Sequence, residues 1–159
     1  MNDGRRIGRH DYNQRLEELA AAFAGRYGRV EYGSGLSASG RTIKLRITVH
    51  LPGWFVPDEA TLVLVEKHEW RAGAWERYAY AYDLHRTPRP SGRFAYHWHD
   101  DVFHIHCADP REPRLDHHYK GFEVDDLFWV ADQLYLMFAR GIACFGLQPL
   151  RDWVEEVAG

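Results

Sequence analysis

The sequence lacks the features that define several protein classes. Its longest aliphatic run, Ala60–Val65, is far shorter than the roughly 20 apolar residues that a membrane span needs, so we expect no membrane contact. No apolar stretch follows the basic N-terminus, so we expect no secretory signal. The only two cysteines, Cys107 and Cys144, make no disulfide framework and no CxxC metal pair, which is consistent with a reducing compartment. These absences predict a cytoplasmic protein without a structural zinc ribbon.

Neither sign of charge is in large excess. The chain has 20 Lys and Arg residues against 23 Asp and Glu residues, a formal net charge of −3. Because nucleic-acid affinity depends on cations that neutralise phosphates, this balance excludes a broad phosphate-binding surface and leaves room for a local patch only. The sequence also lacks repeats, low-complexity tracts and a dividing linker, and its 159 residues predict a single domain, 1–159, with its own core.

Hydrophobic periodicity predicts the secondary structure. Apolar residues at three- and four-residue spacing indicate an amphipathic helix from Asp11 to Tyr27, and period-two alternation indicates a strand from Ile43 to Leu51. The glycine- and serine-rich segment 33–40 between them predicts a turn. Further strands are expected at 61–70, 75–84, 92–99 and 102–108, followed by helices at about 124–140 and 152–157. We therefore expect an α+β fold with an N-terminal helix, an antiparallel meander sheet of about five to six strands, and C-terminal helices packed on one face.

Histidines are the unusual component. Six of the ten lie between His97 and His118. A turn centred on Asp100 and Asp101 would pair His97 with His104, Ala95 with His106 and His99 with Val102. All four hairpin histidines would then share one face, while aromatic and aliphatic side chains such as Tyr96 and Trp98 form the opposite face.

The same register argument extends to the neighbouring strands. Pairing Tyr82 with Phe94 would place Tyr78, Tyr80 and Tyr82 in an aromatic core ladder and Ala79 next to His97. Glu66 would lie opposite Ala79, and His68 opposite Arg77. The predicted polar groove then comprises Glu66, His68, Arg77, His97, His99, His104 and His106.

Three functional hypotheses remain open for this groove. His97, His99 and His104 could converge on zinc or another divalent transition metal, with a carboxylate such as Glu66 completing the site. Alternatively, without any cofactor, two neighbouring histidines act as general base and acid in RNA cleavage, with Arg77 or Lys120 stabilising the developing charge. The third hypothesis is a non-catalytic protein-interaction module, because an antiparallel sheet commonly has one solvated polar face. The residues predicted to carry catalysis are His97, His104, His117, His118, Lys120, Glu66 and Arg77.

The stretch from Tyr96 to Phe138 also resembles a known family. It contains Tyr96-His97-Trp98, a short turn, Phe103-His104-Ile105-His106, a proline-containing loop and His117-His118-Tyr119-Lys120-Gly121 before an amphipathic helix. This pattern is similar to the TumE-like toxin proteins of bacterial toxin-antitoxin systems, over at most the final 85 residues. The resemblance implies a toxin, here a ribonuclease acting through the histidine-rich face, and a cognate antitoxin as its protein partner.

Overall fold

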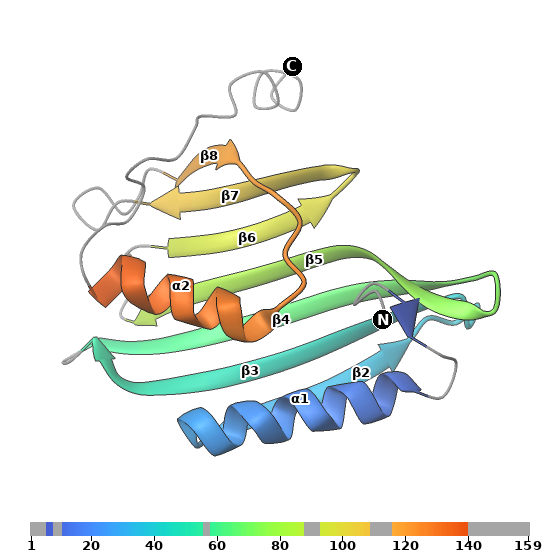
Figure 1. Cartoon of the computed structure of the whole chain (residues 1–159), viewed down its shortest axis with the longest axis horizontal. Helices are drawn as coiled ribbons and strands as arrows, with labels where there is room; N and C mark the ends of the chain where they lie inside the picture. The colour runs from blue at the N-terminus through green and yellow to red at the C-terminus, as the bar shows by residue number, and fades with distance from the viewer. Residues whose placement is uncertain (1–5, 8–10, 56–57, 88–92, 109–115, 140–159) are drawn as a thin grey trace.

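The structure, a computed structural model, describes residues 6–7, 11–55, 58–87, 93–108 and 116–139. The strands follow one another along the sheet in the order β2-β3-β4-β5-β6-β7-β8, and every neighbouring pair is antiparallel (Figure 1). The short strand β1 also pairs with β5, outside this order. The elements are β1 Arg6–Ile7, α1 Asp11–Tyr27, β2 Val30–Leu36, β3 Thr42–Phe55, β4 Asp58–Arg71, β5 Ala74–Thr87, β6 Arg93–His99, β7 Val102–Ala108, β8 Asp116–Lys120 and α2 Leu127–Ala139. The predicted α+β meander is confirmed.

Three strands of the sheet were not predicted, and the first of them is the two-residue strand β1, which pairs with β5. Strand β2 includes Gly33, Ser34 and Gly35, which have turn-forming composition and become a strand only because β3 pairs with them. Strand β8 contains His117 and His118 in a segment too polar and too short to show a strand pattern. The sheet therefore has seven strands in its meander instead of five or six. The predicted helix at 152–157 lies outside the described residues.

Both helices cover the same face of the sheet (Figure 1). The buried face of α1 includes Leu16 and Phe23, and Phe23 stacks on Phe128 of α2 with ring centroids 4.4 Å apart. Helix α2 begins after Asp126, whose Oδ1 accepts hydrogen bonds from the backbone N–H groups of Phe128 and Trp129, as an N-cap does. The predicted helix at about 124–140 would include Asp126 in its first turn, whereas Asp126 is the capping residue.

The core lies between these helices and one face of the sheet. This helix-covered face includes Ile47, Leu64, Tyr82, Phe94 and Trp98, all of which are buried. The opposite face, here called the outer face, is defined by one cross-strand row in which each residue pairs with the next: Gly33, Arg46, Val65, Ala81, His97, His104 and Lys120. Alternation along each strand thus separates an aromatic core from a polar surface.

Cys107 of β7 is completely buried on the core side and is disulfide-bonded. This contradicts the expectation that the cysteines make no disulfide. The cysteines therefore no longer support a reducing compartment, and Cys144 lies outside the described residues. Neither α1 nor α2, the helices of the described chain, has both the length and the hydropathy needed to cross a membrane.

Candidate functional site

The four hairpin histidines share the outer face, as predicted. In the β6–β7 hairpin His97 pairs with His104, Ala95 with His106 and His99 with Val102. The turn residues Asp100 and Asp101 have φ angles of 52° and 61°, the left-handed values that a two-residue hairpin of the observed twist requires. The sequence therefore predicted the register correctly, because the turn and the hydrophobic alternation agree.

Three of these histidines form a compact cluster, His97, His104 and His106. One ring nitrogen of each lies within 4.8 Å of the others. The Nε2 atoms of His104 and His106 are 3.0 Å apart, and the rings of His97 and His106 have centroids 4.4 Å apart. Two nitrogens bound to one tetrahedral zinc ion are about 3.3 Å apart, so the His104–His106 pair already has nearly the required spacing.

His104 occupies the centre of the cluster and is 1% exposed. Burial, and to a smaller extent the charges that His106, His97 and His99 would carry, together lower its pKa to about 3. At neutral pH its imidazole is therefore neutral, which is the form that binds metal ions. A pKa this low does not suit a general acid at neutral pH, so it gives little support to the pairing of His97 and His104 in cofactor-free RNA cleavage.

Asp83 of β5 holds the ring of His97. Its Oδ2 lies 2.9 Å from Nε2 of His97, which leaves Nδ1 of that ring for another ligand. A carboxylate that orients a ligating histidine is a common feature around bound metals. This contact was not predicted from the sequence, because the predicted register of β5 and β6 is wrong. Pairing Tyr82 with Phe94 would place Asp83 opposite Arg93, whereas Asp83 pairs with Ala95.

The cluster of His97, His104 and His106, called the histidine triad below, differs from the predicted ligand set of His97, His99 and His104. His99 lies at the end of the hairpin, where its Nδ1 is 3.2 Å from Oδ2 of Asp100 and its side chain is 45% exposed. His106 takes its place because the sheet brings the diagonal neighbours His97 and His106 together. The alternation of β7 already placed His106 on the correct face and could have identified it.

Strand β8 adds His118 and Lys120 beside the cluster. His118 pairs with His106, and their ring centroids are 4.3 Å apart. Lys120 pairs with His104 and is exposed. His117 occupies a different row, at the register position opposite the core residue Cys107. Of the three residues of β8 that were predicted to be catalytic, His118 and Lys120 therefore lie in the same cross-strand rows as the histidine cluster, and His117 does not.

Glu66, His68 and Arg77 do not lie in the histidine groove, and this part of the predicted placement is wrong. Arg77 does pair with His68, but Lys67 pairs with Ala79, so Tyr78 is an extra residue that forms a β-bulge. Because side chains alternate with period two, one extra residue moves the following residues to the other face. All three side chains are buried on the helix-covered face, and Tyr78, predicted to be core, is 37% exposed.

These three residues form a polar cluster under the helices. Arg77 donates hydrogen bonds from Nη1 to the Tyr82 hydroxyl and from Nη2 to Asp125, both at 2.8 Å. Glu66 pairs with Arg15 of α1 at 3.1 Å. The cluster connects β4 and β5 to α1 and to the segment before α2, so its contacts stabilise the packing of the helices on the sheet.

Comparison with known proteins identifies no relative. No family model matches the chain, and no curated protein or solved structure is significantly similar to it. The resemblance to TumE-like toxins, and the antitoxin partner it implies, therefore stay predictions. The arrangement of the outer-face histidines is the basis for the function proposed below.

Proposed function

We propose that this protein binds one divalent transition-metal ion through His97, His104 and His106 and uses the ion in a hydrolytic reaction. The observation that carries the proposal is the convergence of three imidazole nitrogens within 4.8 Å on one sheet face. Zinc is the metal that such a set favours, because zinc enzymes commonly use three protein nitrogen ligands and keep a fourth position for water. Manganese and iron are alternatives, since both accept imidazole nitrogen.

The surroundings of the triad support a catalytic centre. Three ligands leave a coordination position for a water molecule, whose pKa a bound zinc ion lowers to about 7. Asp83 orients His97, and exposed Lys120 in the next strand supplies a positive charge for a developing anion. These features fit hydrolysis, in which the water oxygen bonds to the electrophilic centre and the departing group takes up a proton.

A metal titration tests the proposal. Protein purified without a histidine tag is titrated calorimetrically with Zn²⁺, and with Co²⁺ so that visible absorption reports the coordination. We expect one ion per chain. His106→Gln removes a metal ligand and should lower the affinity for the ion by more than about 100-fold. Asp83→Asn removes only the carboxylate that orients His97 and should lower the affinity by about 10–100-fold.

His50→Gln is the matched control. His50 lies in β3, where its Nε2 contacts Glu31 of β2, and strands β4 and β5 separate it from the hairpin that carries the triad. The control should bind one ion with wild-type affinity. Absence of stoichiometric binding by the wild type, or equal losses in His50→Gln and His106→Gln, would show that the triad is not a metal site.

A further inference from the structure

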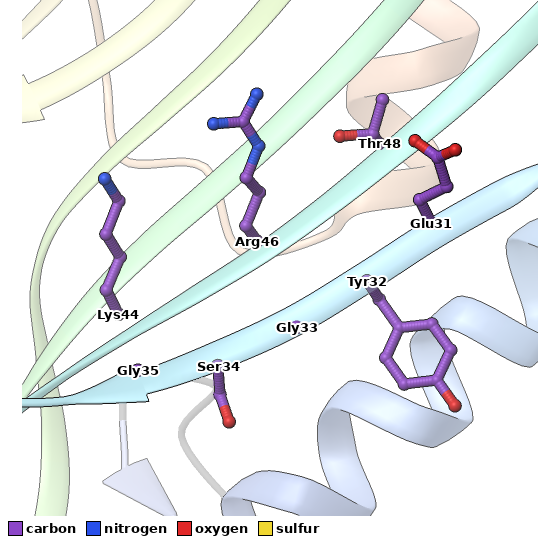
Figure 2. Close-up of a pocket in the computed structure, with 8 residues that line it drawn as sticks. All are labelled: Glu31, Tyr32, Gly33, Ser34, Gly35, Lys44, Arg46 and Thr48. Carbon is purple, nitrogen blue, oxygen red and sulfur yellow. The ribbon is translucent and has the colours of Figure 1, made fainter.

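A second feature of the outer face lies at the opposite edge of the sheet. A groove of about 580 Å³ runs along β2 and β3, and Glu31, Gly33, Gly35, Lys44, Arg46 and Thr48 line it from the outer face. Figure 2 shows Lys44, Arg46 and Glu31 rising from that side of the strands, while Tyr32 extends toward α1. The groove therefore opens on the same face as the histidine triad.

Two uncompensated cations, Lys44 and Arg46, line this groove, and a third, Lys67, lies beside it in β4. Lys44 pairs directly with Lys67 of β4, and Arg46 lies two residues from Lys44 on the same face. None of the three has an acidic partner within salt-bridge distance among the residues that the structure describes. Like charges directly opposite each other destabilise a strand pair unless an anion neutralises them.

The acidic residue of the groove does not supply that anion. Glu31 is the only acidic residue that lines it, and its carboxylate contacts Arg29 at 3.4 Å and His50 at 3.6 Å. Its charge is therefore already shared with two other side chains, so Lys44, Arg46 and Lys67 remain available to an external anion.

Glycines keep the groove open. A Cβ atom added at Gly33 or Gly35 would meet no atom within 4 Å, and neither residue has a positive φ angle. The backbone therefore does not require glycine at these positions, although glycine weakens a strand. Glycine within a strand often marks a place where a ligand approaches the backbone.

The groove and the triad lie on one straight path. Arg46 pairs with Val65, Val65 with Ala81 and Ala81 with His97, so the row crosses the sheet without a register break. Three strand spacings separate Arg46 from His97, about 14 Å. The two residues between them are small and apolar, so an extended ligand meets no charged side chain in this row before the histidines.

We infer that Lys44, Arg46 and Lys67 bind phosphate groups of a single-stranded oligonucleotide whose chain crosses the outer face to the histidine triad. The inference rests on the proposed metal-dependent hydrolysis and names its substrate class. At the triad the oxygen of the metal-bound water bonds to phosphorus, the phosphorus–oxygen bond to the next nucleoside breaks, and the departing oxygen takes up one of the protons of the water. An extended ligand is favoured over a small anion because the two sites are about 14 Å apart.

Fluorescence anisotropy with a labelled single-stranded oligonucleotide tests the inference. Three phosphate contacts predict a salt dependence of the logarithm of the affinity with a slope of about −2. Arg46→Gln should weaken binding at least about tenfold and reduce the slope by about 0.7. Arg26→Gln removes the same charge from α1 on the opposite face and should retain wild-type binding.

Gly33→Val separates binding from folding. The added side chain enters open space and fits a strand, so the variant should fold with wild-type stability yet bind the oligonucleotide more weakly. Wild-type binding by this variant would overturn the inference. So would equal competition by inorganic phosphate or pyrophosphate at matched phosphate concentration, or a wild-type dimer that Gly33→Val converts to monomers.

The metal-binding and oligonucleotide-binding experiments can refute the two proposals independently of each other. Arg46→Gln should still bind one metal ion, and His106→Gln should still bind the oligonucleotide but lose its hydrolysis. A protein that binds metal but no oligonucleotide would refute the inference and leave the metal site standing. A protein that binds and cleaves the oligonucleotide without any metal would refute the proposed function and retain the cationic groove.

Discussion

His68 should make the folding stability of this protein sensitive to mild acid. It is completely buried in β4, and neither ring nitrogen has a hydrogen-bond partner among the residues described. Burial lowers its pKa from 6.5 to about 4, although the nearby Glu66 charge, with Oε2 3.8 Å from Nε2, raises it. The fold therefore strongly favours the neutral imidazole.

The magnitude follows from the difference between the folded and unfolded pKa values. As the pH falls below about 6.5, the unfolded chain takes up a proton at His68 that the folded chain accepts only near 4. Stability is therefore lost as the pH falls through this window. The full difference corresponds to about 3 kcal/mol, and about 2 kcal/mol of it should be lost between about pH 7 and about pH 5.

Urea denaturation at these two pH values measures the effect. His68→Gln removes the titrating ring and keeps a polar side chain, so the variant should lose about 2 kcal/mol less than the wild type between the two pH values. Leu64→Ala, on the same buried face, should cost the same free energy at both. Equal pH dependence in the wild type and His68→Gln would refute the reasoning. If the variant does not fold, an NMR titration that gives His68 an ordinary pKa would refute it equally.

Two further predictions concern the segment after β8. A Cβ at residue 121 would lie 2.7 Å from the backbone N of His104 and 2.8 Å from its Cα, so Gly121→Ala should cost about 1–3 kcal/mol in thermal unfolding and weaken zinc binding. Gly33→Ala, which enters open space, is its control, and wild-type stability of Gly121→Ala would contradict the close approach. The Tyr80 hydroxyl donates to the Phe122 carbonyl at 3.2 Å and accepts from the Val124 N–H at 2.9 Å, so Tyr80→Phe should cost about 1–3 kcal/mol in urea denaturation. Exposed Tyr78→Phe should be neutral, and an equal loss in both variants would show that these two bonds do not stabilise the segment.

Local residue patterns predicted the structure correctly where neighbouring residues in the chain fix its geometry. Helix α1 follows from the spacing of Leu16 and Phe23, and the β6–β7 register follows from a two-residue turn and strict alternation. The predictions were wrong where the pairing between strands inserted an extra residue or formed a strand that the local sequence does not indicate. The bulge at Tyr78 cannot be read from the β5 sequence, since nothing local distinguishes the extra residue from a regular one. Strand β2 was missed because its glycines resemble a turn until β3 pairs with them.

The sequence by itself determined the fold class and the common face of the hairpin histidines, because helix and strand periodicities are properties of adjacent residues. Only the tertiary structure decided which histidines converge, since His106 reaches His97 across the diagonal of the sheet and Asp83 reaches it from a third strand. It also decided that Glu66 and Arg77 belong to the core side. Those outcomes depend on strand register and on one bulge, and both are set by contacts between segments far apart in the chain.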